Sequence, residues 1–368
     1  MPKNNHRVAR ATRPTRLARR RPGGRLAAGL LSVAATAGLA TGALATAAAA
    51  PASAAQARVN ADAGMPRYYV LGQETATGAG VVQVRSSATG AVISSVTGPA
   101  ACDPKTFKVA TADDRNFVVG CDTPQATSQS IGFYRLQVSS RGRPSGLRPL
   151  AIKTPDDALD AVDLTPDGGR LAIAMQGYNE GPGGPGAVEV VTLKTGATRT
   201  WTGSSPYDLT WTDNGRELGL FEGSGLYRFN PGTTGTTLKS ARQVLSRSYH
   251  SSGVETAKLS PDGRTIIASV TYDLGNKPLH RGVVVGGIVR ISAQTKQQLA
   301  TLLPIHAQYS ADGGGSEAGW YQTNCVLGPI DRTGRHMLVN CDRFGRLDRS
   351  RFTALPGVPP VASFSAAW

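Results

Sequence analysis

Short apolar segments separated by turn-forming residues recur along the chain from residue 67 onward, and the clearest example spans 161–174. It reads Ala-Val-Asp-Leu-Thr-Pro-Asp-Gly-Gly-Arg-Leu-Ala-Ile-Ala. Pro166 presets φ for a turn, Asp167 can accept hydrogen bonds from nearby backbone, and Gly168 tolerates a positive φ. The small and β-branched residues on both sides are typical of a buried antiparallel pair. The stretch therefore predicts a tight β-hairpin.

The hairpin pattern recurs, and the recurrence predicts the fold. Copies stand at 107–120, 161–174, 208–221, 256–269 and 326–339. Second strand pairs are predicted after several of them, at 188–193 with 198–201, 225–229 with 237–241, and 287–291 with 298–302. Four strands in about 45 to 50 residues are typical of a propeller blade. One blade cannot bury both faces of its sheet, so the blades are expected to pack around a ring.

The two ends of the repeating region complete each other. Segments 68–71, 81–85 and 91–96 form three strands that lack a leading inner strand. The last residues, 361–368, have the pattern of an inner strand with no blade after it. Joining them removes the open edge of the ring. The sequence thus predicts an all-β, six-bladed propeller of four-stranded antiparallel blades with one shared blade, and seven blades is the alternative.

Two of the turns resemble a known repeat. Leu164-Thr-Pro-Asp-Gly-Gly-Arg170 and Leu259-Ser-Pro-Asp-Gly-Arg-Thr265 are similar to the Ser-Pro-Asp-Gly repeat of TolB-like and WD-repeat-like bacterial β-propellers. The resemblance implies the fold over nearly the whole chain after the N-terminal region. It does not imply one function, because such propellers serve many roles. The Gly-His and Trp-Asp dipeptides of eukaryotic WD repeats are absent.

The N-terminal region has the pattern of an export signal. Eight arginines between Arg7 and Arg25 precede an Ala-rich apolar run at 26–50, and Ala52-Ser53-Ala54 supplies a cleavage site, with a second after Ala57. We predict a signal peptide at 1–54, a flexible leader at 55–66 and the propeller domain at 67–368. We therefore predict a secreted protein with no membrane span after cleavage. Association with the cell envelope is the alternative location. A transmembrane anchor is the alternative interpretation of the run.

The formal charge of +15 is concentrated in this region. Nine of the 40 Lys and Arg residues, and none of the 25 acidic ones, lie in the first 54 residues. The remainder carries 31 basic and 25 acidic residues, which is a mild excess of positive charge. A nucleic-acid partner is therefore not predicted.

The four cysteines fall into two close pairs. Four cysteines allow three disulfide connectivities, and an exported protein is expected to form disulfides. In each pair one cysteine precedes an inner strand and the other ends the next strand, so an antiparallel hairpin brings them together. The predicted disulfides are Cys102–Cys121 and Cys325–Cys341.

The long irregular loops are predicted on the face opposite the Pro-Asp-Gly turns. They span 122–130, 176–186, 249–253, 272–282 and 306–323. Long loops on one side of a rigid scaffold commonly bind ligands. We predict a non-enzymatic, monomeric protein that binds a protein, peptide or glycan there. The candidate binding residues are Tyr178, Asn179, Glu180, Tyr249, His250, Tyr272, Asp273, His280, Arg281, Trp320 and Tyr321.

No catalytic motif stands out. The nucleophile elbow Gly-x-Ser-x-Gly does not occur, and the histidines do not have metal-ligand spacing. No cofactor and no metal are predicted. The alternative is a metal-assisted propeller enzyme, similar to a lactonase or lyase, acting at the channel mouth. Asp160, Asp208 and Glu255, near the starts of inner strands, are the residues that favour it. An envelope assembly or scaffold factor is a third possibility.

Overall fold

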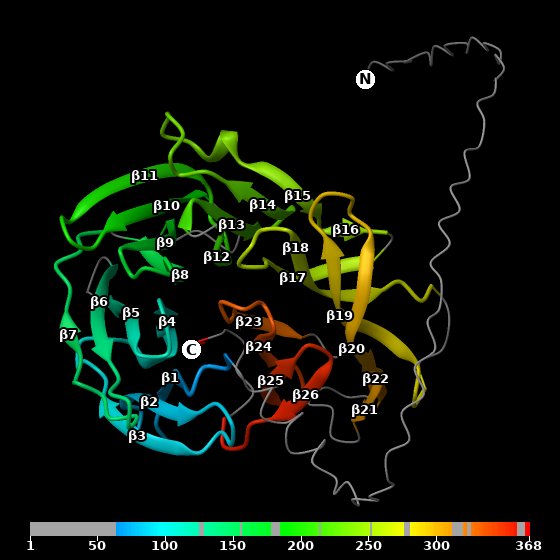
Figure 1. The fold of residues 1–368 in the computed structure, drawn as a ribbon, viewed down its shortest axis with the longest axis horizontal. Coiled ribbons are helices and arrows are strands. Elements are labelled where there is room, and N and C mark those ends of the chain that lie inside the picture. Colours follow the sequence, from blue (N-terminus) through cyan, green and yellow to red (C-terminus); the bar gives the residue numbers. More distant parts are fainter. Residues whose placement is uncertain are drawn as a thin grey trace, which may run out of the picture. The chain divides into compact units, whose positions relative to one another are not determined.

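The computed structural model describes residues 64–124, 129–154, 157–177, 185–212, 215–250, 252–275, 280–310, 319–321, 325–358 and 365–368. All of them belong to one compact unit, Ala57–Trp368. Within it, antiparallel sheets are arranged in sequence order around a common centre, as Figure 1 shows. Among the described residues no helix is long and apolar enough to cross a bilayer.

Six sheets form the blades, and we number them in chain order. Blade 1 has β27 (Ala366–Ala367), β1 (Tyr68–Glu74), β2 (Gly80–Ser86) and β3 (Val92–Thr97). Blade 2 has β4 (Lys108–Thr111), β5 (Asn116–Pro124), β6 (Gln129–Gln137) and β7 (Arg148–Pro149). Blade 3 has β8 (Asp157–Leu164), β9 (Arg170–Gly177), β10 (Pro185–Thr192) and β11 (Ala197–Ser204).

The second half of the ring continues the pattern. Blade 4 has β12 (Asp208–Thr212), β13 (Glu217–Glu222), β14 (Gly225–Phe229) and β15 (Arg242–Ser246). Blade 5 has β17 (Ser252–Leu259), β18 (Thr265–Tyr272), β19 (Val284–Ser292) and β20 (Gln298–His306), with β16 (Ser248–Tyr249) added beside β17. Blade 6 has β23 (Val326–Ile330), β24 (His336–Asn340), β25 (Phe344–Asp348) and β26 (Arg351–Ala354). The predicted six-bladed propeller is confirmed.

The shared blade is confirmed as well. β27 pairs antiparallel with β1, with Val70 opposite Ala367 and Leu71 opposite Ala366. One step earlier, the Gly72 N–H donates to the Ser365 carbonyl at 2.9 Å and the Ser365 hydroxyl donates to the Gly72 carbonyl at 2.8 Å. The C-terminal strand thus supplies the inner edge that the first three strands lack. Of the predicted strand at 361–368, residues 361–364 lie outside the described residues.

The Pro-Asp-Gly turns are hairpins between the first and second strands, as predicted. In blade 3 the Thr165 N–H donates to the Arg170 carbonyl at 2.9 Å, and the Asp167 carboxylate accepts the Gly169 N–H at 2.9 Å. Gly168 has φ of 69°, a conformation that glycine adopts without strain. These bonds are local, so the sequence alone specifies the turn.

The core lies between neighbouring blades rather than in one central mass. One apolar cluster joins blades 3 and 4 and includes Ala172, Val188, Trp201 and Phe229. The Trp201 and Phe229 rings meet edge to face with centroids 5.1 Å apart. Each sheet buries both of its faces against the neighbouring sheets, so these core side chains do not fill the channel at the centre of the ring.

Both predicted disulfides are present, Cys102–Cys121 and Cys325–Cys341. Cys102 and Cys325 precede the inner strands β4 and β23, whereas Cys121 lies within β5 and Cys341 directly follows β24. The described part of the chain has no free cysteine. Paired cysteines are consistent with an oxidising, extracytoplasmic compartment.

The fourth strand of blade 4 was predicted wrongly at 237–241. That stretch contains a 3₁₀ turn, Leu238–Ser240, and the strand is β15. Val244 and Leu245 of β15 are 2% and 3% exposed, so this later segment contributes the apolar side chains that the blade needs.

All five predicted loops overlap strands, and residues 176–177, 185–186 and Tyr272 belong to β9, β10 and β18. Residues 122–124 and 129–130 belong to β5 and β6, and 249–253 includes the pairing of β16 with β17. Within 306–323, β21 (Gln308–Ser310) pairs with β22 (Gly319–Tyr321).

Candidate functional site

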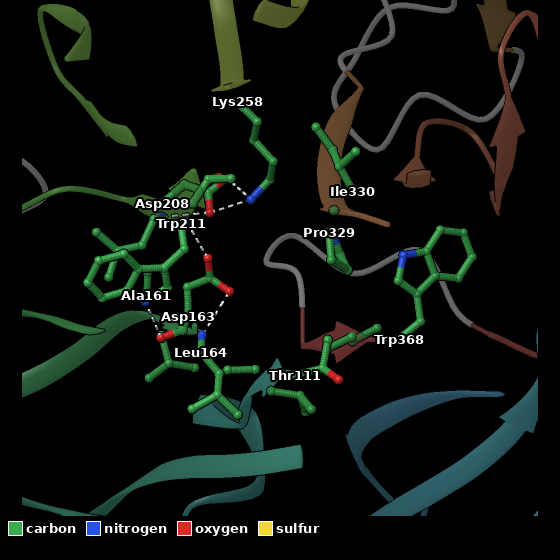
Figure 2. Close-up of a pocket in the computed structure, with 18 of the residues that line it drawn as sticks. Thr111, Ala161, Asp163, Leu164, Asp208, Trp211, Lys258, Pro329, Ile330 and Trp368 are labelled. Atoms are coloured by element: carbon green, nitrogen blue, oxygen red, sulfur yellow. Dashed lines mark hydrogen bonds and ion pairs between the residues drawn. The ribbon is translucent and has the colours of Figure 1, made fainter. Parts of the chain in front are cut away.

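The inner strands of all six blades surround one cavity of about 780 Å³. Cavities of about 300–1,000 Å³ are typical of small-molecule sites. Its wall includes residues of β4, β8, β12, β17, β23 and β27. Figure 2 shows side chains from these strands facing a common space. We refer to this cavity as the central channel.

The end of the channel beside the Pro-Asp-Gly turns is crossed by Arg332. Its guanidinium, from the β23–β24 turn, donates to the carbonyls of Ala112 and Pro166 in the corresponding turns of blades 2 and 3. Residues Gly64, Met65 and Pro66 line the same cavity. The arginine therefore ties three blades together and obstructs this end.

An ion pair stands in the wall between blades 4 and 5. The Lys258 ammonium lies 2.6 Å from Oδ1 and 2.5 Å from Oδ2 of Asp208. The Lys258 side chain is 8% exposed, so the pair is well shielded from bulk water. Dashed lines in Figure 2 mark both contacts. Breaking a shielded pair from one side is costly, because it leaves a buried charge without a partner.

Asp163 faces the channel from β8 and joins blade 3 to blade 4. Its carboxylate accepts the Trp211 backbone N–H at 2.6 Å and the Leu164 N–H at 2.9 Å. Burial raises the pKa of Asp163 to about 7, although these bonds and Lys258 oppose the rise. Near neutral pH this carboxyl is therefore divided between its protonated and ionised forms.

Two further carboxyls lie beside the inner strands of blades 2 and 3. Asp122 accepts the Leu159 N–H at 2.9 Å, and burial raises its pKa to about 6. Asp160 accepts the hydroxyl of Ser205, and burial raises its pKa too. Each of these carboxyls has a donor from a neighbouring residue of the protein.

Lys108 of β4 is the second lysine of the channel wall. Burial lowers the pKa of Lys108, and the charges of Asp160, Asp122 and Asp208 partly offset the effect. Within the described ranges its ammonium makes no hydrogen bond or ion pair, in contrast to Lys258. The channel thus holds one paired and one unpaired lysine.

Aromatic and aliphatic residues complete the wall. Trp211 donates its indole N–H to the Asp163 carbonyl at 3.2 Å, and the Arg170 guanidinium lies 4.9 Å from its ring centroid. Trp368, the last residue, is 3% exposed and lines the opposite side, next to Thr111 in Figure 2. Leu209 and Phe221 add apolar surface. The channel therefore combines apolar wall segments with ten charged residues, seven of them acidic.

Some of the sequence-predicted binding residues come together elsewhere. Tyr249, His250 and Tyr272 line a separate shallow pocket on blade 5. The Tyr249 and His250 rings meet edge to face with centroids 4.3 Å apart. The Tyr249 hydroxyl donates to the Lys296 carbonyl at 2.9 Å, so part of this cluster serves to pack the blade.

The other predicted residues do not join this cluster. Asp273, His280 and Arg281 are exposed, and Asp273 accepts the Gly275 N–H within its own turn. None of the described candidates lines the central channel. Tyr178, Asn179 and Glu180 lie outside the described residues. For Trp320 and Tyr321 the structure gives only their place in β22.

The three acidic residues named for the enzyme alternative, Asp160, Asp208 and Glu255, do line the channel. Glu255 accepts the Thr271 hydroxyl at 3.2 Å, and Asp208 is paired with Lys258. No group of three or more His, Cys, Asp or Glu in the described part of the chain is arranged to hold a metal ion.

Sequence reasoning missed Lys108, Asp163 and Lys258. A signal for two of them was present, because Asp163 and Lys258 each stand immediately before the leucine of a Pro-Asp-Gly repeat. A charged residue at the same position of two repeats, inside an apolar strand, indicates a shared environment that can accommodate charge. Lys108 lies in the degenerate copy at 107–120, which lacks the Pro-Asp-Gly turn and gave no such signal.

Comparison with known proteins gives distant similarities of fold. No family model matches the chain, and no curated protein matches it in sequence. Kuenenia stuttgartiensis hydrazine synthase is 12% identical with a TM-score of 0.40, covering 77% of each chain. A Bacteroides uniformis protein provisionally assigned as a 6-phosphogluconolactonase is 14% identical, with a TM-score of 0.38 over 79% of this chain and 81% of that one.

A protein from Agrobacterium tumefaciens provisionally assigned as TolB is 12% identical. The match covers 65% of this chain and 83% of that chain, with a TM-score of 0.37. The resemblance to TolB-like propellers is therefore a distant one of fold, and no function is transferred from any of these proteins.

Proposed function

We propose that this protein is an exported, non-enzymatic binding propeller that holds its extracellular ligand in the central channel. The observation that carries the proposal is the channel itself, a cavity lined by all six blades in which apolar side chains are combined with charged ones. Ligand sites commonly pair a largely apolar lining with a few polar groups that fix orientation. The signal-like N-terminus and the two disulfides support an extracytoplasmic setting.

Arg332 obstructs the turn side, so we expect the ligand to reach the channel from the face where the inner strands begin. That face is the one on which the sequence places the long loops. A small solute, or the end of a peptide or glycan, would be held in the channel. Tyr249, His250 and Tyr272 would contact only parts of a larger ligand outside it.

The test is a ligand-observed NMR screen with a mixed library of small acids, amines, sugars and short peptides. Thr210 of β12 lines the channel, and Thr210→Trp fills part of it. The matched control is Leu299→Trp, at a side chain that is 55% exposed on β20. Both variants are checked for folding by thermal unfolding.

Hits that compete with one another, disappear in T210W and persist in L299W support the proposal. Hits that persist in T210W but disappear in Tyr272→Ala would move the site to the blade 5 pocket. The absence of any hit on the wild-type protein would contradict a binding role in the channel.

An enzyme acting in the same channel is the second candidate. The observation that favours it is Asp163, since a carboxyl whose pKa is raised to about 7 can exchange a proton near neutral pH. Asp163 already accepts two backbone N–H groups, one on each carboxylate oxygen, so a general-base role would use the remaining lone pair of either oxygen. Conversion of a screening hit by the wild-type protein, lost in Asp163→Asn, would support the enzyme.

A further inference from the structure

We propose that the face of the ring that carries the Pro-Asp-Gly turns binds the surface of an anionic membrane through a patch at blades 1 and 2. The patch consists of Arg67, Val92, Ile93, Arg141 and Arg143, and we call it the basic corner. The turn face is formed by the segments that join the first strand to the second, and the third to the fourth, in each blade. The inference is independent of what the channel binds.

The turn face holds an excess of positive charge. Its turns, together with Arg67 directly before β1, contain 12 Lys and Arg residues and six Asp residues. This excess is as large as that of the whole chain after residue 54. Every blade contributes an exposed basic side chain, in order Arg67, Arg143, Lys194, Arg216, Arg264 and Arg335. Among the residues that the structure describes, the exposed acids of these turns are Asp167 and Asp262. One face of the ring can therefore attract an anionic surface.

The acids nearest the basic corner are bound to backbone. Asp114 accepts the Arg67 N–H at 3.1 Å, and Asp113 accepts the N–H groups of Arg115 and Asn116 at 2.8 Å each. Both carboxyls are half-buried. In contrast, the three guanidinium groups of the corner are exposed and make no hydrogen bond or ion pair within the described ranges. They are free to contact an anionic partner.

The blade 2 turn that carries Arg141 and Arg143 is held against blade 1. The Ser94 hydroxyl donates to the Gly142 carbonyl at 2.6 Å. Gly142 has φ of 76° and lies so close to Ile93 that a Cβ added to it would stand 2.8 Å from the Ile93 Cγ2 atom. The two arginines thus flank the glycine that packs on Ile93, so charged and apolar side chains form one surface.

Val92 and Ile93 are exposed apolar residues where β3 begins at the turn face. They are 48% and 42% exposed. Val84 pairs with Ser94 and Arg85 pairs with Val92, so Ile93 is the extra residue of a β-bulge in this outer strand. Insertion into the boundary between lipid headgroups and acyl chains would remove their apolar surface from water.

The combination of side chains favours a membrane over a soluble polyanion. A polyanion in solution would use the arginines alone and gain nothing from Val92 and Ile93. At a membrane, the arginines would contact anionic headgroups while the apolar pair reaches the acyl boundary. With the turn face against the membrane, the opposite face, where we expect the channel to open, would point into solution.

The experiment is sedimentation with vesicles of phosphatidylcholine, with or without about one third phosphatidylglycerol. The protein lacks residues 1–54, because their arginines would bind anionic vesicles by themselves, and every strand of the ring lies after residue 67. The variants of the basic corner are Arg141→Gln with Arg143→Gln, and Val92→Thr with Ile93→Thr. Thermal unfolding checks that each variant is folded.

The matched control removes two charges from the opposite face. It combines Lys105→Gln with Lys153→Gln, at exposed lysines that precede the inner strands β4 and β8. Wild type and this control should bind anionic vesicles about tenfold or more tighter than neutral ones, and added salt should weaken the binding. The arginine variant should lose about tenfold or more in affinity for anionic vesicles.

The Val92 and Ile93 variant separates the two kinds of partner. It should bind anionic vesicles about threefold to tenfold more weakly than wild type, with unchanged retention on a heparin column. Unchanged vesicle binding in this variant would assign the face to a soluble polyanion and overturn the inference. Equal affinity of wild type for both vesicles, binding to neither, or equal losses in the arginine variant and the lysine control would also overturn it.

Discussion

Asp163 of blade 3 accepts the backbone N–H of Trp211 in blade 4 at 2.6 Å, so a side chain of one blade completes the inner edge of the next. The same relationship recurs between Asp122 of blade 2 and the Leu159 N–H of blade 3, at 2.9 Å. The inner strands β8 and β12 have no further strand beside them, and their edge N–H groups need other acceptors. Both carboxyls hold neighbouring blades in register, and Asp163 also lines the channel.

The first prediction concerns pH. Burial raises the pKa of Asp163 to about 7, above the unfolded value of about 3.9. The stability that this group contributes is fully present below the unfolded pKa and is lost as pH rises through about 7. Asp163→Asn should therefore gain about 2–3 kcal/mol relative to wild type when the pH is raised from 5 to 8. Urea unfolding at both pH values measures the change.

The matched control is Asp167→Asn in the adjacent turn. The Thr165 hydroxyl, followed by the Gly169 N–H, lowers the pKa of Asp167, so its contribution is lost only as pH falls through that lowered value. D167N should show no gain between pH 5 and pH 8. A constant difference between D163N and wild type across this range would contradict the assigned environment of Asp163.

The second prediction concerns ring closure. Trp368 is 3% exposed and packs in one apolar cluster with Tyr69, Leu71 and Phe344. Trp368→Ala should lower the free energy of unfolding by about 3–5 kcal/mol, as for other large-to-small changes at buried aromatic residues. The control Leu299→Ala, at an exposed position, should change it by less than about 0.5 kcal/mol. Equal effects of the two changes would show that the C-terminal strand does not stabilise the ring.

The third prediction concerns the disulfide of blade 2. Cys102 and Cys121 are 19 residues apart, and cross-linking a loop of this size stabilises a protein by about 3 kcal/mol in the chain-entropy model. Replacing both cysteines with alanine should lower stability by about that amount, measured by urea unfolding of the oxidised proteins. The 16-residue separation of Cys325 and Cys341 predicts a similar loss for the corresponding double variant. An unchanged midpoint in either variant would contradict a structural role for that bridge.

The repeat could be predicted because its determinants are local, and the closure because the repeats left three strands at one end of the chain and one at the other. The turn at Thr165–Arg170 depends on adjacent residues, and its recurrence fixes the spacing of strands. The disulfides followed from the same register. The strand at 237–241 was misplaced because Val244 and Leu245, which the blade buries, follow a short 3₁₀ turn that the apolar pattern did not reveal.

The channel site could not be predicted because its residues meet only through the ring. Lys258 and Asp208 are 50 positions apart, and Trp368 reaches the cavity only after the two chain ends pair. A single charged residue in a strand gives no indication of which other strand it will face. The loop residues named from the sequence, among them Tyr249 and His250, lie instead in the blade 5 pocket or at exposed positions.

The most direct test of the channel as the ligand site is a crystal of the protein soaked with a brominated analogue of a hit from the ligand screen and measured at the bromine absorption edge. A ligand held in the channel gives one anomalous peak inside the ring, between the walls that hold Trp211 and Trp368. A peak on the loop-bearing face or in the blade 5 pocket, with an unoccupied channel, would contradict it.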